Sequence, residues 1–222
     1  MLDTTSPGGR RPNLDPELIG DLAAALGLTF VDDGRGDGMS TFGPEDVFHY
    51  YYAILNSPAY RARYADLLVY DFPRLPPITD TALFWALTGF GAALIDLHLL
   101  RPKGVVGVGG AGGAMALTAP GVPFPVAGPG EVREVRYEAP GEGQHAGRVW
   151  INDEQDFARV DAIAWEWRVG GYQPAQRWLT DRRGRTLTFD DLRHYGRIVA
   201  ALRETARVVA AIDALLPGWP LP

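Results

Sequence analysis

The residues best placed to do chemistry lie between Val169 and Val199, in the stretch VGGYQPAQRWLTDRRGRTLTFDDLRHYGRIV. Arg182, Arg183 and Arg185 occupy a turn-like DRRGR sequence that precedes a long helical pattern. Guanidinium groups bind phosphates, and they also bind O6 and N7 of guanine in pairs. The segment therefore predicts a surface that contacts an anionic partner, and nucleic acid fits this chemistry.

Seven further side chains have the polarity or the ring system to contact nucleic acid, and they are Arg61, Arg63, Asn152, Gln155, Tyr172, Gln173 and Gln176. A glutamine amide carries the donor and acceptor that match the major-groove edge of adenine. Tyr172 can donate a hydrogen bond or stack on a base. Arg61 and Arg63 lie near the start of a predicted helix, where backbone N–H groups also favour phosphate.

A purely structural interpretation competes with this one. In it, Trp178, Leu179 and Tyr195 belong to the core, and Asp181 pairs with an arginine to cap the turn. We favour the core for Trp178 and Leu179, and we favour DNA contact for the arginines. Such phosphate contacts would orient the protein on a duplex without reading its sequence.

No set of residues predicts catalysis or a metal site. The chain contains no cysteine, which excludes disulfides, thiolate metal sites and a cysteine nucleophile. Its four histidines are widely separated, and none has the HExxH spacing of a zinc site. No GxSxG sequence is present. The glycine-rich run GVVGVGGAGGAM lacks the Gly-Lys-Ser/Thr ending of a phosphate-binding Walker loop.

Charge is distributed unevenly along the 222 residues. The net charge of −6 argues against general, non-specific binding to nucleic acid. Residues 1–130 hold 8 basic and 13 acidic side chains, whereas nine arginines face five acidic residues between Trp165 and Arg207. A local basic face on an acidic protein is compatible with docking one polyanion in one orientation.

The patterning predicts an α+β fold with a helical N-terminal part, a small antiparallel sheet and a long C-terminal helix. Asp15 and Asp80 are placed as helix N-caps, and Ser57-Pro58 marks a further helix start. Alternating apolar and charged residues indicate strands rather than helices after residue 130. The expected helices are 16–26, 44–55, one starting at Ser57-Pro58, 81–100, a short one near 161–165 and 189–216, and the expected strands are 131–138, 148–152 and 166–169.

We expect residues 1–13 to be a disordered tail and residues 14–216 to form a single domain. Within it, the run Gly104–Gly130 contains nine glycines and four prolines but no charged residue. Helices of membrane length do not tolerate such a composition, so a loop is expected here and no membrane association. The N-terminus has no apolar segment of the kind that a secretory signal requires.

Four blocks together resemble the C-terminal target-recognition domain of type ISP restriction–modification enzymes and related large adenine-specific DNA methyltransferases. They are DVFHYYYAILNSPAYRARYADLLVYDFPRLP, LFWALTGFGAALIDLHLL, GRVWINDEQDF and WEWRVGGYQPAQRWLTDRRGRTLTFDDLRHYGRIVAALRETA, and they cover roughly residues 44–213. The resemblance implies a non-catalytic, sequence-specific module that binds double-stranded DNA in the cytoplasm.

The same resemblance implies a methyltransferase–translocase domain or subunit as partner. AdoMet and ATP are implied only for that partner, because the Asn/Asp-Pro-Pro-Tyr/Phe motif, the AdoMet glycine loop and the ATPase motifs are absent from this chain. The alternative is a protein-interaction or scaffold subunit, or a remnant derived from such a domain, that does not bind DNA alone.

Overall fold

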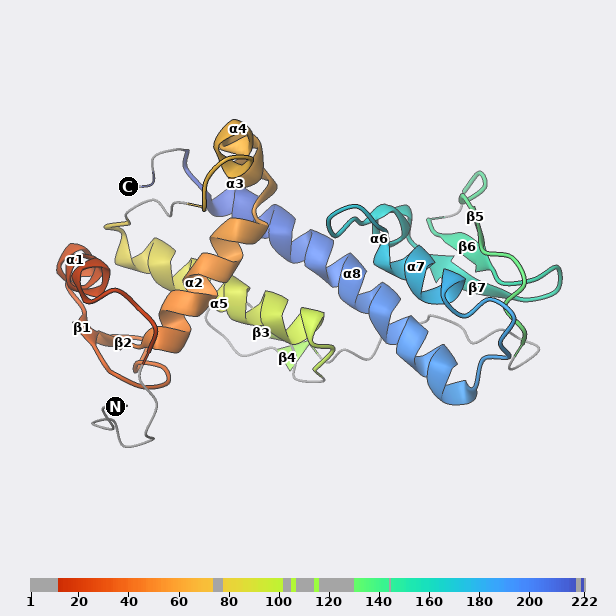
Figure 1. Ribbon diagram of the computed structural model, residues 1–222, viewed down its shortest axis with the longest axis horizontal. Helices are drawn as coiled ribbons and strands as arrows, with labels where there is room; N and C mark the ends of the chain where they lie inside the picture. Colours follow the sequence, from red (N-terminus) through yellow and green to blue (C-terminus); the bar gives the residue numbers. More distant parts are fainter. Residues whose placement is uncertain are drawn as a thin grey trace. The chain divides into compact units, whose positions relative to one another are not determined.

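The computed structural model describes residues 12–73, 78–101, 105–106, 114–115, 130–143, 145–218 and 221. Most of the predicted tail over residues 1–13 and most of the Gly104–Gly130 loop lie outside this description. Two short strands are described within that loop, β3 (Val105–Val106) and β4 (Ala114–Met115), and they pair with each other. The expected α+β class is confirmed (Figure 1).

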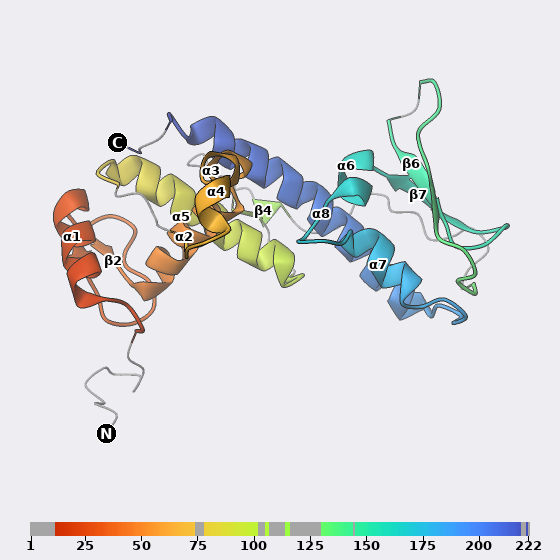
Figure 2. The ribbon, with the colours of Figure 1, turned by 45° about the horizontal axis from the view of Figure 1, so that its top comes forward.

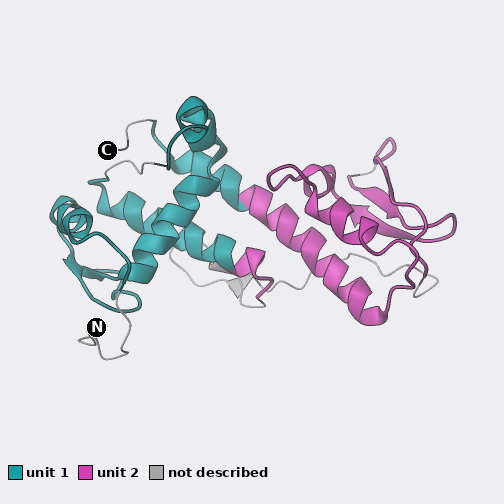
Figure 3. Ribbon diagram, viewed as in Figure 1, with its two compact units in different colours: residues 1–95, 106–113, 208–222 teal, residues 96–105, 114–207 magenta. Residues whose placement is uncertain are grey.

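The chain forms two compact units (Figure 3). Unit 1 comprises residues 1–95, 106–113 and 208–222, and unit 2 comprises residues 96–105 and 114–207. Segments from three places in the sequence therefore build unit 1. The single domain expected over residues 14–216 stays a prediction.

Unit 1 is mainly helical. Its elements are α1 (Pro16–Leu26), β1 (Thr29–Phe30), β2 (Thr41–Phe42), α2 (Pro44–Asn56), α3 (Pro58–Arg63), α4 (Ala65–Leu68) and most of α5 (Thr81–His98). β1 and β2 pair in parallel. Fully buried rings and aliphatic side chains of Phe42, Tyr50, Ile54, Phe84 and Leu94 form its core.

In unit 1, α1, α2, α3 and α5 begin where the sequence predicts, whereas α4 was not predicted. The Asp15 carboxylate accepts a hydrogen bond from Glu17 N at 2.9 Å, and Gly27 ends α1 with a left-handed φ of 65°. Ser57 Oγ accepts from Tyr60 N at 3.1 Å at the start of α3, and Asp80 Oδ1 accepts from Leu83 N at 3.0 Å. Each cap satisfies an N–H group that has no partner inside the first helical turn.

Helices α2 and α5 cross closely in unit 1, as both ribbon views show (Figure 2). The contact is made at Gly91, where an added Cβ would lie 1.8 Å from the backbone oxygen of His49. Among the described helices, α5 alone is long and apolar enough to span a membrane by length and composition. Its side chains Phe84, Leu87 and Leu94 are fully buried in the core, as in a central helix of a globular unit.

Unit 2 packs a three-stranded antiparallel sheet against helices. The sheet has the order β5-β6-β7, from β5 (Arg136–Glu138), β6 (Gly147–Trp150) and β7 (Asp156–Val160). The helices are α6 (Ala162–Glu166), α7 (Pro174–Thr180) and the part of α8 (Phe189–Leu215) up to Arg207. Val149, Phe157, Leu179, Tyr195 and Val199 join these elements in one buried cluster.

Two strand predictions are wrong. Only residues 136–138 of the expected strand 131–138 join the sheet, because Arg133 N and Glu134 N both donate to the single carbonyl of Ile151, which breaks the ladder. The segment 166–169 is not a strand, since Val169 forms one bridge to Tyr172 across a tight turn at Gly170. The third strand is instead β7, at residues 156–160.

Candidate nucleic-acid interface

The sequence DRRGR, residues Asp181–Arg185, forms a rigid turn between α7 and α8, which we call the arginine turn. Gly184 N donates to Val132 O at 2.8 Å, and Val132 N donates to Arg185 O at 3.0 Å. Within the turn, Arg185 N donates to Arg182 O at 3.0 Å. Gly184 has a φ of 77°, a left-handed value that glycine adopts without steric cost. The backbone that carries the three arginines is therefore fixed to the segment ahead of the sheet.

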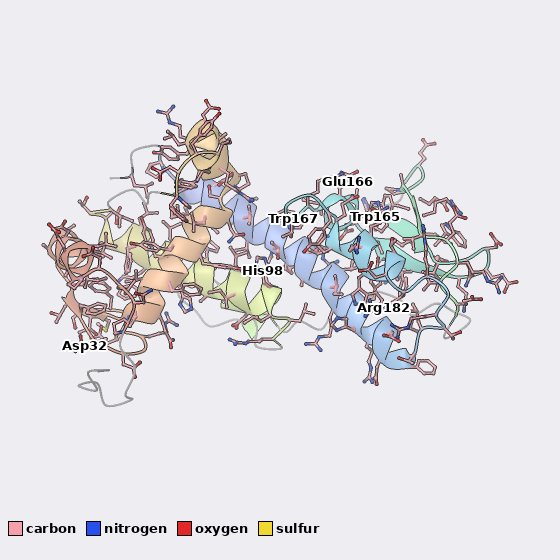
Figure 4. The ribbon with its side chains drawn as sticks, viewed as in Figure 1. Asp32, His98, Trp165, Glu166, Trp167 and Arg182 are labelled. Atoms are coloured by element: carbon pink, nitrogen blue, oxygen red, sulfur yellow. The ribbon has the colours of Figure 1, made fainter. Side chains whose placement is uncertain are left out.

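Arg182 is held inside unit 2. Its guanidinium lies 3.6 Å from the centre of the Trp178 ring, and its Nη1 donates to Trp178 O at 2.9 Å. It also lies 3.8 Å from the Asp191 carboxylate at the start of α8, next to which Figure 4 labels it. Only 24% of the Arg182 side chain is exposed. Its stacked and charge-paired guanidinium therefore packs the turn against α8.

Arg183 and Arg185 have a different environment. Both are exposed, and no hydrogen bond or ion pair of their side chains exists among the described residues. Among the described residues, their guanidinium groups thus keep all five N–H donors free. The turn presents two cations on a backbone that the third arginine helps to hold in place.

The start of α8 balances part of this charge. Thr188 N and Oγ1 donate to the Asp191 carboxylate at 2.9 and 2.8 Å, and the positive charges of Arg182 and Arg185 lie nearby. These hydrogen bonds, followed by the two cations, hold the pKa of Asp191 below its usual value. Asp191 therefore remains ionised and offsets part of the positive charge of Arg182 and Arg185.

The glutamine and tyrosine candidates beside α7 are divided in the same way. Gln173 Nε2 donates to Trp165 O at 3.0 Å, so its amide is engaged within unit 2. Gln176 is exposed on α7, and its side chain makes no hydrogen bond to a described residue. Tyr172 is 53% exposed just before the helix. Gln176 and Tyr172 are free to make outward contacts.

Asn152 and Gln155 hold the turn between β6 and β7. Asn152 Nδ2 donates to Glu131 O at 3.0 Å and to Gln155 Oε1 at 2.9 Å, while its Oδ1 accepts from Gln155 N at 2.8 Å. Gln155 is buried, with 9% of its surface exposed. This network engages the amide groups that the sequence offered for base contacts.

Arg61 and Arg63 lie on α3, in unit 1, whereas the other eight candidates belong to unit 2. Both are exposed. Arg61 Nη2 donates to Asn56 O at 3.0 Å, and the Arg63 side chain has no hydrogen bond or ion pair with a described residue. The structure therefore brings the unit 2 candidates into one compact body and leaves the two α3 arginines in the other.

The sequence did not single out the surroundings of the arginine turn. A pocket of about 610 Å³ is lined by Trp178, Arg182, Asp190, Asp191, Arg193, His194 and Arg197. Its cations are already engaged: Arg193 pairs with Asp190, and Arg197 donates to Leu100 O. The helical i,i+3 spacing of Asp190 and Arg193 was the only sequence signal for these contacts. No cluster of potential metal ligands is found among the residues that the structure describes.

The chain is similar to parts of solved structures. The chain resembles a DrdV–DNA complex with a TM-score of 0.57 and 20% identity, covering 93% of this chain and 20% of that one. It resembles the ATP-dependent Type ISP restriction–modification enzyme LlaBIII bound to DNA with a TM-score of 0.50 and 16% identity, covering 81% and 11%. A nuclease-deletion mutant of the Type ISP enzyme LlaGI in complex with a DNA substrate mimic gives a TM-score of 0.48 and 18% identity, covering 80% and 14%.

The chain thus spans a fifth or less of the length of these structures. No curated protein matches the sequence. A family model does match it, that of the Type ISP C-terminal specificity domain, over residues 2–211. Because this match extends over nearly the whole chain, the protein belongs to the Type ISP C-terminal specificity domain family.

Proposed function

We propose that this protein is the target-recognition module of a Type ISP-like restriction–modification system and that it binds a specific sequence in double-stranded DNA. The arginine turn is the observation that carries the proposal. It offers two exposed guanidinium groups, those of Arg183 and Arg185, on a backbone fixed by hydrogen bonds to Val132. Membership of the specificity-domain family and the DNA-bound LlaBIII and DrdV complexes support the same assignment.

In this proposal, residues whose side chains are exposed and unengaged contact the DNA, and residues engaged within unit 2 support them. Arg183 and Arg185 contact phosphates or a guanine edge, and Gln176 and Tyr172 contact bases beside them. Arg182, Gln173, Asn152 and Gln155 hold the backbone of these outward residues in place, since their polar groups are engaged within unit 2. Arg61 and Arg63 add phosphate contacts from unit 1.

The chemistry belongs to a partner. We propose that this chain is not catalytic by itself and that a methyltransferase–translocase domain or subunit, which would use AdoMet and ATP, acts on the DNA held here. A cytoplasmic location follows from that role. The alternative, a scaffold subunit that does not bind DNA, is not favoured, because the specificity-domain family match and the DNA-bound LlaBIII and DrdV complexes both support recognition of DNA.

The test is a fluorescence-anisotropy titration with a randomised duplex library, followed by sequencing of the bound fraction. Enrichment of a short motif is expected. With the enriched duplex, Arg183→Ala and Arg185→Ala should each weaken binding by about five- to a hundredfold, corresponding to ~1–3 kcal/mol for a lost contact to phosphate or base. Binding should weaken steeply with salt, because bound arginines displace counterions from the duplex.

Arg193→Ala is the matched control, since it removes the same charge from an exposed arginine that is already paired with Asp190. Its affinity should stay close to that of the wild type. Equal affinity of wild type and both turn variants would contradict the assignment of the arginine turn. Failure of the wild type to bind any duplex at low salt would contradict the proposed function itself.

A further inference from the structure

Arg159 lies on a β-bulge in the sheet of unit 2. The register of β6 with β7 pairs Gly147 with Val160 and Arg148 with Ala158, so Arg159 has no partner across the ladder. Its backbone has a φ of 57°. A residue in this left-handed conformation at a bulge is usually glycine, because a Cβ is strained there.

The chain otherwise uses glycine for this conformation. Seven glycines and only two other described residues, Leu100 and Arg159, have a positive φ. Leu100 lies two residues beyond the end of helix α5 at His98, at a position where left-handed residues are common. Arg159 lies inside a strand, where the same conformation is strained and persists only if the surrounding structure enforces it.

No hydrogen bond or ion pair between the Arg159 side chain and a described residue offsets this strain. The side chain is exposed. The neighbouring arginines of the sheet are engaged: Arg148 lies 3.7 Å from Asp156, and Arg136 stacks 5.5 Å from the Trp150 ring centre. Arg159 is thus a cation that a strained bulge presents to the outside with its five donors unused.

We infer that Arg159 is a further DNA-contacting residue, which binds the phosphate backbone of the recognised duplex. This inference rests on the proposed function and extends it from the arginine turn to the sheet of the same unit. Bulges re-aim side chains near functional sites, and strained backbone conformations cluster at such sites. A phosphate ligand for the guanidinium therefore gives the strained position of Arg159 a functional reason. Arg136 and Arg148 lie on the same sheet, together with the carboxylates of Glu138 and Asp156. Among the cations of this sheet, Arg159 alone has neither an ion pair nor a ring contact with a described residue.

The decisive variant is Arg159→Gly, because it should raise the thermal stability of the protein while lowering its affinity for the duplex. Glycine relieves the left-handed backbone, so the Tm should rise, by about 2 °C. The guanidinium is lost, so duplex affinity should fall by about fivefold or more, to the same extent for target and non-target sequences. The slope of log affinity against log salt should become less steep by about 0.9, the value for one phosphate contact.

Arg159→Lys keeps a cation on the strained backbone and should retain the salt slope without the gain in Tm. Arg193→Ala again controls for the loss of one charge. Wild-type affinity and slope in Arg159→Gly would overturn the inference while leaving the proposed function intact. A loss confined to the target sequence would overturn the phosphate assignment, and a wild type that binds no duplex would overturn the proposed function together with this inference.

Discussion

Identical side chains acquire different roles in this protein through their immediate neighbours. Arg182 and Arg183 are adjacent in the sequence, yet only Arg182 reaches the Trp178 ring one helical turn before it. The same distinction separates Gln173, whose amide bonds to Trp165 O, from the exposed Gln176. At the scale of single residues, a side chain that is engaged internally supports the site, and one without an internal partner is available to form it.

In the core of unit 2, Tyr195 is a side chain whose polar group is buried without a described partner. It is fully buried, and its hydroxyl has no hydrogen-bond partner among the residues described. Tyr195→Phe removes a buried polar group that is unsatisfied, so the free energy of unfolding should rise by about 1 kcal/mol. Urea unfolding at pH 7 measures this, and Tyr172→Phe, at an exposed position, should leave stability unchanged.

The same residue predicts a pH dependence. Burial raises the pKa of Tyr195 well above its ordinary value of 10.0. A raised pKa in the folded state means that stability is complete below pH 10 and falls as the pH rises further, because only the unfolded chain ionises. The advantage of Tyr195→Phe should therefore grow between pH 9 and pH 11. A constant difference across that range would show that the phenol ionises equally well in the folded state.

At the scale of elements, glycine at a helix crossing decides whether two helices can meet. Gly91 on α5 contacts the backbone of α2 so closely that Gly91→Ala must push the helices apart. We expect a loss of about 2–3 kcal/mol in the free energy of unfolding, the cost of overpacking a core. Gly20→Ala on α1 is the control, since an added Cβ there meets nothing within 4 Å. It should stabilise by about 0.5–1 kcal/mol through helix propensity, and chemical denaturation of both variants gives the comparison.

The helices were predictable from sequence because their caps are local. Asp15, Ser57 and Asp80 mark helix starts through bonds to residues two or three positions ahead. β7 was missed because the bulge at Arg159 places Phe157 and Val160 on the same buried side, three residues apart, which destroys the alternation of a strand. The sequence pattern carries no sign of an extra residue in a ladder.

The candidate site was predictable only in outline. Its arginines stand out by their density between residues 165 and 207. Which of them face outward depends on contacts distant in sequence, such as the bond from Gly184 N to Val132 O. The engagement of Asn152 with Glu131 O is likewise non-local, at a separation of 21 residues. Roles fixed by tertiary contacts of this kind cannot be deduced from residue type and spacing.

At the scale of the whole molecule, one helix serves two cores. Residues 189–207 of α8 belong to unit 2 and residues 208–215 to unit 1. In unit 1, the Asp213 carboxylate accepts hydrogen bonds from Ser57 Oγ at 2.5 Å and from Ala59 N at 3.1 Å. This carboxylate therefore caps α3 from the far end of the sequence.

Asp213→Ala should lower the free energy of unfolding by about 2–3 kcal/mol, because it leaves the buried Ser57 hydroxyl and the Ala59 N–H without their charged acceptor. Thermal or urea unfolding of the full chain measures the change. Asp21→Ala, at an exposed position on α1, should stay within about 0.5 kcal/mol of the wild type. Similar values for the two variants would mean that the cap does not contribute to unit 1.

The distance of 156 residues between Ser57 and Asp213 also sets an order of events during translation. The first helices of unit 1 leave the ribosome long before their last partner is made, by roughly 8–30 s at typical elongation rates of about 5–20 residues per second. The whole of unit 2 is synthesised in that interval. Unit 2 is therefore completely synthesised before unit 1. The core of unit 1 can form fully only after the final turns of α8 have been synthesised.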